Sequence, residues 1–129
     1  MLSIYEFPNS VCCQKVNLAL FEKNLEWESI FLNLAKNEHF SSEYLKLNPK
    51  GVVPTLIHDG VPIIESTSIC EYLDEAFPGS GPGNNLIPDA PLECVQMKGW
   101  SKVVDEGLHE GVADISFSAM FLLSVSHYQ

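Results

Sequence analysis

A first group of residues whose types and spacing could support chemistry lies in the stretch NPKGVVPTLIHDGVPIIES, residues 48–66. Within it, Val53–Pro54 opens an apparent strand, where a proline removes a hydrogen-bond donor from the ladder. A cis bond before Pro54 would turn the backbone so that Val53 presents its N–H and C=O groups outward. These two groups can hold an extended peptide as a neighbouring strand would. An ordinary turn is the alternative.

Glu65 and Ser66 stand where a helix is predicted to begin. Free N–H groups and the helix dipole favour a carboxylate at such a point, and the Ser66 hydroxyl adds a donor. The Glu65 side chain can pair with an ammonium group. Together with Val53, these residues predict a site for a short peptide that carries both an α-amino and an α-carboxylate group. An ordinary helix cap would use the same residues.

A second group of candidates lies in PNSVCCQKV, residues 8–16. Ser10 is a good N-cap for a helix, and Cys12 and Cys13 follow in its first turn. A donor at a helix N-terminus can stabilise a thiolate, and a cysteine there can itself ionise. The competing roles are a plain cap for Ser10 and a small buried hydrophobe for each cysteine. Helical periodicity places Cys12 on the buried stripe, with Cys13 about 100° around the helix.

Hydrophobic periodicity predicts the elements that position these residues. A strand, a helix that ends before Asn24 and a second strand form a right-handed βαβ unit with a parallel pair. A further helix ends at Asn48–Pro49, and Asp59–Gly60 makes a hairpin turn between two antiparallel strands. The predicted strands cover residues 2–7, 26–32, 54–58 and 61–64, and the predicted helices cover residues 11–23, 34–47 and 65–76.

The order βαβ, then α, then ββα predicts an α/β fold that resembles the thioredoxin-like plan, a mixed four-stranded sheet with helices on both faces. We assign residues 1–77 to this domain. Residues 78–91 hold three glycines and four prolines and predict a linker. In residues 92–129, apolar side chains at helical spacing predict one long helix from about Leu92 to Leu123, with an apolar stripe that must pack on something.

Composition narrows the possible partners and compartment. The formal net charge is −10, with seven lysines and no arginine, which disfavours nucleic acid and anionic membranes as partners. The four cysteines form no CxxC pair, and the histidines are scattered, so no metal is expected. The N-terminal residues lack the pattern of a signal peptide, and no apolar run is long enough to span a bilayer. We expect a cytoplasmic protein with reduced thiols.

Five short motifs occur in a fixed order: Asn48–Pro49, Val53–Pro54, Asp59–Gly60, Glu65–Ser66 and Glu71–Tyr72–Leu73. After a strand-helix-strand opening, this set resembles the N-terminal domain of the cytosolic glutathione transferases. The resemblance covers residues 2–78 closely and the remainder more loosely. It implies that this domain binds glutathione as a co-substrate. It also implies that a following helical domain takes a small hydrophobic electrophile, and that the protein is a homodimer.

The resemblance also implies roles for individual residues. By this resemblance, Val53 and Pro54 contact the cysteinyl part of glutathione. Glu65 and Ser66 contact its γ-glutamyl part. His39 and Lys50 contact its glycyl carboxylate. For His39 and Lys50, a solvated surface role is the alternative.

Two residues compete for the chemical step. Counted back from Lys15–Val16, Ser10 falls at the thiol-activating serine of serine-type members, and Cys12 falls at the nucleophilic cysteine of dehalogenase-like and reductase-like members. A serine donor implies conjugation or thiolytic cleavage of an ether or halide. A cysteine implies glutathione-dependent thiol transfer or reductive dehalogenation. We favour Ser10, with Cys12 second.

The stretches ESTSICEYLDEAFPGSG and VDEGLHEG resemble the bacterial glutathione-dependent β-aryl-etherase branch. Members of the family carry several helices after the linker, whereas this chain provides one. We therefore expect a fragment or shortened product that lacks most of the second-substrate pocket. The expected function is a glutathione transferase, and the alternative is a non-catalytic module that binds glutathione or a protein. An exposed apolar stripe on the long helix predicts self-association.

Overall fold

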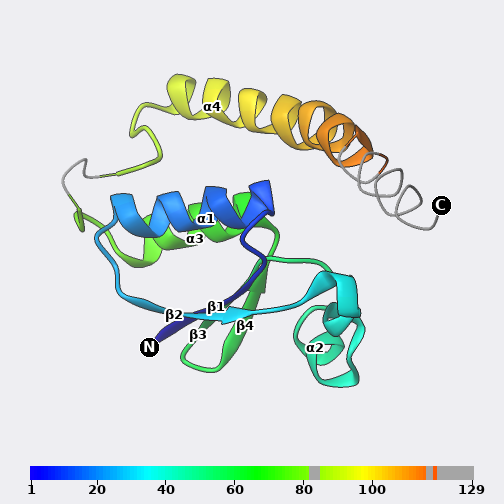
Figure 1. The fold of residues 1–129 in the computed structure, drawn as a ribbon. Coiled ribbons are helices and arrows are strands. Elements are labelled where there is room, and N and C mark those ends of the chain that lie inside the picture. Colours follow the sequence, from blue (N-terminus) through cyan, green and yellow to red (C-terminus); the bar gives the residue numbers. More distant parts are fainter. Residues whose placement is uncertain (82–84, 116–117, 119–129) are drawn as a thin grey trace. The chain divides into compact units, whose positions relative to one another are not determined.

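The computed structural model describes residues 1–81, 85–115 and 118. The chain separates into two compact units, one over Met1–Ile87 and one that begins at Pro88 (Figure 1). We describe each unit by itself. No helix within the described residues is long and apolar enough to cross a membrane.

The first unit contains one mixed sheet. Within the described residues, four strands lie in the order β2-β1-β3-β4; β1 is parallel to β2, and β3 is antiparallel to both β1 and β4. The elements are β1 (Leu2–Glu6), α1 (Val11–Glu22), β2 (Trp27–Phe31), α2 (Ser42–Leu47), β3 (Thr55–His58), β4 (Val61–Ile64) and α3 (Ser66–Ala76). This order confirms the predicted thioredoxin-like plan.

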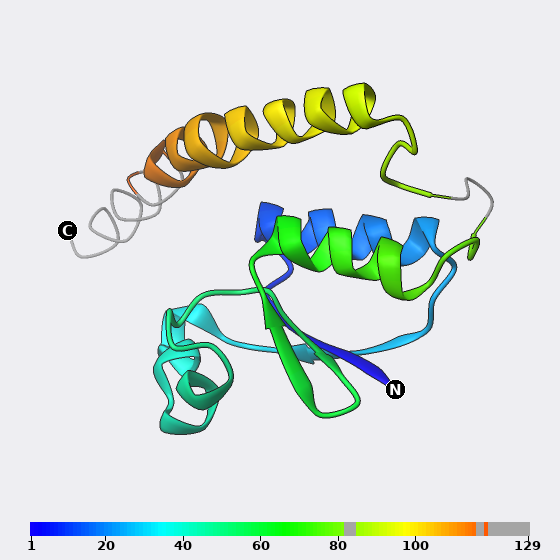
Figure 2. The same cartoon turned by 180° about the vertical axis from the view of Figure 1, so that it is seen from behind.

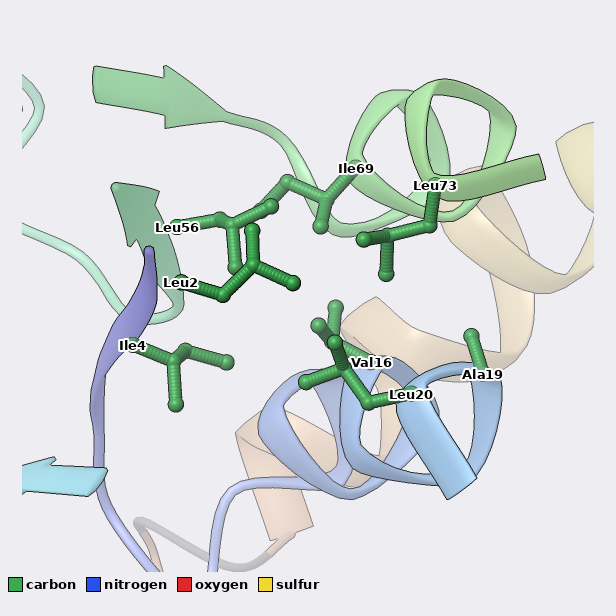
Figure 3. Packing of buried hydrophobic residues seen from close by; sticks show 8 residues of the cluster. All are labelled: Leu2, Ile4, Val16, Ala19, Leu20, Leu56, Ile69 and Leu73. Carbon is green, nitrogen blue, oxygen red and sulfur yellow. The ribbon is translucent and has the colours of Figure 1, made fainter. Parts of the chain in front are cut away.

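A hydrophobic core joins the sheet to α1 and α3, which lie side by side over one face (Figures 1 and 2). Figure 3 shows the buried residues that meet there: Leu2, Ile4 and Leu56 from the sheet, Val16, Ala19 and Leu20 from α1, and Ile69 and Leu73 from α3. Each fully buried aliphatic side chain stabilises the fold by about 1.5–3 kcal/mol. On the opposite face, Tyr44 of α2 packs on Tyr5 of β1, with ring centroids 5.4 Å apart.

The predicted helix over residues 34–47 is wrong in its length. The structure has two 3-10 turns, η1 (Leu34–Lys36) and η2 (Glu38–Phe40), and a short α2. Asn33 and Ser41 each cap the next turn with a side-chain oxygen, and Asn37 between them has a left-handed φ of 59°. These side chains offer the backbone local partners that compete with a continuous helix.

The predicted turns are confirmed. Asp59 and Gly60 both have positive φ angles, 49° and 84°, as a tight hairpin turn of type I′ requires. Asn24 has a φ of 51° directly after the C-cap of α1, where a left-handed residue commonly ends a helix.

The segment after α3 is anchored to the first unit. A side chain at Gly81 would begin 1.8 Å from the carbonyl oxygen of Glu22, so only glycine fits there. Further along, the Asp74 carboxylate accepts hydrogen bonds from the backbone N–H groups of Leu86 (2.7 Å) and Ile87 (3.0 Å). These contacts hold both ends of residues 81–87 against α1 and α3.

The described part of the second unit is helical from Pro91 onward. α4 (Pro91–Val103) starts with a proline at its first position, and a π-helical turn, η3 (Val104–Leu108), follows it. Helical conformation then continues through residues 109–115. The predicted single helix therefore contains a π-helical turn, and the parts predicted over residues 116–117 and 119–123 lie outside the described residues.

Candidate active site

The sheet topology brings the candidate residues to one edge. β1 and β4 point in the same direction because each is antiparallel to β3. α1 follows β1 and α3 follows β4, so both helices begin at the same edge, as Figures 1 and 2 show. β3 runs the other way and therefore starts at this edge. Thus Ser10 before α1, Val53–Pro54 before β3 and Ser66 at the start of α3 gather along it.

The Val53–Pro54 peptide bond is cis, the first of the two alternatives that the sequence left open. Pro54 is buried and Val53 is half-buried. Within the part of the chain that the structure describes, neither the N–H nor the C=O group of Val53 has a hydrogen-bond partner. Both groups of Val53 therefore remain available to an extended ligand.

Three buried polar side chains, those of Tyr44, Asn48 and Thr55, support the backbone at Val52 and Val53, which we call the Val53 corner. The Tyr44 hydroxyl donates to the carbonyl of Val52 at 2.6 Å and lies 2.8 Å from the Thr55 hydroxyl. The side-chain amide of Asn48 donates to the same Val52 carbonyl (2.8 Å) and to the Thr55 hydroxyl (3.1 Å). Burial raises the pKa of Tyr44, although its bonds with Thr55 and Asn48 act in the opposite direction. The Tyr44 hydroxyl thus stays protonated as a donor.

The N-terminus of α3 has no side-chain cap that would compete with a bound anion. Glu65 is the N-cap residue but makes no side-chain cap bond, so the first N–H groups of α3 lack this partner. Glu65 has φ 70° and ψ 111°, a backbone conformation that costs about 1–3 kcal/mol for a residue other than glycine. Such strain is typical of ligand-binding positions. Ser66 is half-buried at the first helical position.

Lys50 and His39 lie beyond this start. The Lys50 ammonium forms an exposed ion pair with the Glu65 carboxylate at 2.6 Å. His39 stacks on Phe40, with ring centroids 4.0 Å apart, and its Nδ1 atom is buried with no hydrogen-bond partner among the described residues. A Cβ atom on Gly51, next to Lys50, would lie 3.3 Å from the carbonyl oxygen of His39. The structure thus brings the segments of His39 and Lys50 together.

Ser10 caps α1, as predicted. Its side-chain oxygen accepts a hydrogen bond from the Cys13 N–H at 3.4 Å, and its own N–H donates to Phe7. The placement of the cysteines was predicted wrongly, because Cys13 is fully buried and Cys12 is half-buried. Burial raises the pKa of the Cys13 thiol and outweighs the Ser10 hydrogen bond, which lowers it.

Sequence reasoning missed the supporting side chains. The sequence places Tyr44 inside a predicted helix and Asn48 at its end, but periodicity and proline rules do not reveal hydrogen-bond partners. It also missed Lys15, whose ammonium donates to the Thr67 hydroxyl at 2.8 Å and links α1 to α3. A buried asparagine before a proline is a usable signal only once its burial is known.

Within residues 1–81, 85–115 and 118, no group of three or more His, Cys, Asp or Glu side chains could hold a metal ion. All four cysteines fall in this part of the chain, and none of them forms a disulfide.

Comparison with known proteins assigns this sequence to a family. Residues 4–81 match the family described as the glutathione S-transferase N-terminal domain. Protein LigF of Sphingobium sp. (strain NBRC 103272 / SYK-6) is 44% identical over 105 residues, which are 81% of this chain and 40% of LigF. The chain thus spans about two fifths of the length of this relative.

Solved structures agree with this result. The crystal structure of the beta-etherase LigF from Sphingobium sp. strain SYK-6 has a TM-score of 0.81 and 42% identity, covering 88% of this chain and 46% of that one. Glutathione transferase F7 from Populus trichocarpa has a TM-score of 0.83 and 32% identity, covering 98% of this chain and 59% of that one.

A glutathione transferase homologue from Sulfitobacter with bound glutathione has a TM-score of 0.78 and 26% identity, covering 88% of this chain and 52% of that one. The family match spans most of the first unit, and the open corner at Val53 and the open start of α3 lie within it. The chain belongs to the glutathione S-transferase N-terminal domain family.

Proposed function

We propose that this chain is the glutathione-binding part of a glutathione transferase that activates the thiol for attack on an electrophile. One observation carries the proposal. The N-terminus of α1 with Ser10, the unpaired backbone groups of Val53 and the open start of α3 lie along one edge of the sheet. This order matches the thiol, the cysteinyl backbone and the γ-glutamyl end of one extended tripeptide.

In this proposal each group has a distinct task. Val53 pairs with the cysteinyl backbone, while Ser66 and the N-terminus of α3 receive the γ-glutamyl carboxylate. Glu65 receives the α-ammonium, and Lys50 and His39 lie toward the glycyl carboxylate. Lys50 and Glu65 are paired with each other in the structure, at an exposed position where such a pair contributes about 0–1 kcal/mol. A ligand that offers both charges can therefore replace the pair.

The chemical step assigned to Ser10 is stabilisation of the thiolate. The Ser10 side-chain oxygen already accepts from the Cys13 N–H, so its own O–H remains to donate to the glutathione sulfur. The thiol proton passes to solvent, and the α1 dipole also favours the anion. The thiolate then attacks the carbon of a C–O bond, a C–S bond forms, and the departing oxyanion takes a proton from water.

We propose an aromatic ether as the electrophile because the relative LigF, whose solved structure is described as a beta-etherase, is 44% identical to this chain. A halide is the related alternative, since the same thiolate would displace it. Cys12 supports a second candidate function, glutathione-dependent thiol transfer or dehalogenation. Unlike Cys13, Cys12 is only half-buried in the first turn of α1.

The proposal extends to assembly and location. We propose a cytoplasmic homodimer with no metal and no nucleic-acid partner. The exposed apolar side chains of α4, among them Leu92, Val95 and Trp100, support self-association. Four cysteines without a disulfide fit a reducing compartment, and the net charge of −10 fits neither phosphate-rich partners nor anionic membranes.

The test compares Ser10→Ala with Cys12→Ala in the full chain, with glutathione and a β-aryl ether as substrates and release of the phenol as the readout. We expect S10A to lower kcat/KM by about 10²-fold or more while glutathione still binds, and C12A to stay near wild type. Loss only in C12A, measured as glutathione-dependent disulfide reduction, would support the cysteine chemistry instead. Glutathione binding without turnover of any substrate would support a non-catalytic module.

A further inference from the structure

A buried thiol contacts Ser10. Cys13 is fully buried in the first turn of α1, and its backbone N–H donates to the Ser10 side-chain oxygen at 3.4 Å. The Cys13 thiol also lies within hydrogen-bonding reach of the Ser10 hydroxyl and of the backbone of Phe7. Among the described residues, the Ser10 side chain has no hydrogen-bond partner other than Cys13. Cys13 therefore supplies the contacts that orient this hydroxyl.

The protonation state of the Cys13 thiol decides where the Ser10 O–H points. A serine hydroxyl has one proton to donate and can accept two hydrogen bonds. When the neutral thiol donates to the Ser10 oxygen, the N–H and S–H groups of Cys13 fill both acceptor positions, and the Ser10 O–H is left for another acceptor. A Cys13 thiolate has no proton to donate and would accept the Ser10 O–H itself. The thiol must therefore stay neutral for Ser10 to donate to a ligand sulfur.

The surroundings of Cys13 favour the neutral thiol. Burial is the largest cause acting on its pKa and raises it, whereas the hydrogen bonds with Ser10 and Phe7 lower it. The charges of Glu6 and Cys12 raise the pKa of Cys13 further. The balance of these causes leaves the thiol protonated at neutral pH.

Glu6 places a buried carboxylate near this thiol. It is the last residue of β1, its exposed fraction is 3%, and it accepts a hydrogen bond from the side-chain amide of Asn17 at 2.6 Å. Asn17 lies one turn after Cys13 on α1, so the pair occupies the space beside the thiol. From α2, the hydroxyl of Tyr44 is a further titratable group that interacts electrostatically with Cys13. Glu6 is thus an acidic group placed to oppose ionisation of Cys13.

We propose that Cys13 and Glu6 are positioning residues for Ser10. The Cys13 S–H group donates to the Ser10 oxygen and so directs the Ser10 O–H toward the sulfur of bound glutathione, while the Glu6 carboxylate keeps Cys13 in this donor form. The inference rests on the proposed function, because it requires glutathione with its sulfur at Ser10. Both side chains are buried, so they act on the ligand only through Ser10.

The experiment measures the fraction of bound glutathione that is ionised, from the ultraviolet absorbance of its thiolate between about pH 5 and pH 10. The absorbance of the complex with S-methylglutathione, which has no thiol proton, is subtracted at each pH. Cys13→Ala removes the S–H donor, whereas Cys13→Ser keeps a donor that does not ionise in this range. Val16→Ala is the matched control, because it shortens another fully buried side chain of α1.

We expect Cys13→Ala to raise the pH at which half of the bound thiol is ionised by about 0.5–1 unit, the effect of losing one directed hydrogen bond. Cys13→Ser should stay within about 0.3 unit of wild type. Val16→Ala should lower stability without moving this midpoint. Ser10→Ala should raise the midpoint at least as much as Cys13→Ala. An unchanged midpoint in Cys13→Ala, together with a raised one in Ser10→Ala, would overturn the role of Cys13 and leave the proposed function intact.

Glu6→Gln tests the carboxylate on the alkaline side. Without this charge Cys13 should ionise at a lower pH and then take the Ser10 O–H. We therefore expect the preference for glutathione over S-methylglutathione, measured as the ratio of their dissociation constants by calorimetry, to fall about three- to tenfold. This fall should begin at a lower pH in Glu6→Gln than in wild type. Glu28→Gln, at an exposed position of β2, is the matched control and should behave as wild type.

A double variant separates the thiol from other titrating groups. Glu6→Gln combined with Cys13→Ser has no thiol at this position, so the alkaline fall should disappear. A fall that persists in the double variant would overturn the proposed coupling of Glu6 to Cys13. If Cys13→Ala does not fold, the variants that carry Cys13→Ser provide the test. Failure of the wild-type chain to bind glutathione would overturn the proposed function and this inference together.

Discussion

Tyr44, Asn48 and Thr55 form the polar support of the proposed site at the scale of single residues. Their side chains satisfy the Val52 carbonyl and one another below the Val53 corner, and none of them is expected to touch the ligand. A buried polar group that loses its partner costs about 1–3 kcal/mol, so such a network favours one backbone conformation strongly. The Val53 groups are therefore held ready before a ligand arrives.

Tyr44→Phe tests this support. It removes the hydroxyl that bonds to Val52 and Thr55, and we expect the free energy of unfolding to fall by about 1–2 kcal/mol. Glutathione binding should weaken as well, because the corner is less firmly held. Tyr5→Phe is the matched control, since its ring packs on Tyr44 and its hydroxyl has no hydrogen-bond partner among the described residues. An equal effect of the two changes would contradict the proposed support.

Cys12 and Cys13 provide a second test at this scale. Burial raises the pKa of the Cys13 thiol, and the side chain is inaccessible, so the native protein should not be alkylated there at neutral pH. We expect iodoacetamide to modify Cys12 first and Cys13 only after unfolding in urea, with the sites identified by peptide mass spectrometry. Faster modification of Cys13 in the native protein would show that its burial is described wrongly.

Sequence reasoning identified the candidate residues that stand next to a local sequence signal and missed the residues whose role depends on packing. Ser10, Val53 and Ser66 stand beside a cap, a proline and a helix start, each of which has a local sequence signal. The burial of Cys13 depends on the rotation of α1 against the sheet, which periodicity fixes only to within a residue. The partners of Tyr44 and Lys15 lie elsewhere in the sequence and have no local signal.

At the scale of elements, an ion pair fixes α1, α3 and the segment that follows them. The Asp74 carboxylate accepts from the buried Lys23 ammonium and from the N–H groups of Leu86 and Ile87. Burial alone would raise the pKa of Asp74, but these hydrogen bonds outweigh it and bring the pKa below its ordinary value. The stabilisation is therefore complete above about pH 4 and is lost as the pH falls through the lowered pKa.

Asp74→Asn should lower the free energy of unfolding by about 3–5 kcal/mol at pH 7, because it removes the carboxylate that pairs with the buried Lys23 ammonium. The difference from wild type should begin to shrink below about pH 4 and should be lost as the pH falls through the lowered pKa of Asp74. Urea unfolding can be followed by the fluorescence of Trp27, which packs against the core, in a Trp100→Phe background.

Two controls accompany this measurement. Glu75→Gln changes a neighbouring exposed carboxylate and should shift stability by less than about 0.5 kcal/mol. Lys23→Met combined with Asp74→Leu removes both charges and should recover much of the loss. A difference between wild type and D74N that persists unchanged at pH 3 would contradict the pKa assignment.

The elements themselves were largely predictable. Alternating and helical periodicity located the strands and α1 and α3, because each has one face in the core. The prediction for residues 34–47 failed because Asn33 and Ser41 make local side-chain bonds and Asn37 adopts a left-handed conformation, which an averaged helical composition hides. The π-helical turn η3 had no sequence signal that we could identify.

At the scale of the whole molecule, the chain covers 40% of LigF, so the matched region is mainly the first unit and the start of a helical part. α4 and η3 expose Trp100, Val103 and Leu108, with exposed fractions of 72%, 54% and 63%. Apolar side chains at this density usually mark an interaction surface. We therefore place the proposed self-association on this helix.

Sedimentation velocity tests this prediction. The wild-type chain should sediment at about twice its 14.3 kDa mass, and Trp100→Glu and Leu108→Glu should shift it toward the monomer because each places a charge in an apolar contact. Lys98→Glu introduces the same acidic group at another position of α4 and should leave the dimer intact. A monomer for wild type at all concentrations would contradict the assembly.

Calorimetric titration of the chain with glutathione tests the central claim most directly, because every proposed role depends on one tripeptide lying along the sheet edge. We predict saturable binding with one glutathione per chain, weakened in Ser66→Ala and retained in Ser10→Ala. Absence of binding heat across several temperatures, or binding that is indifferent to Ser66, would contradict it.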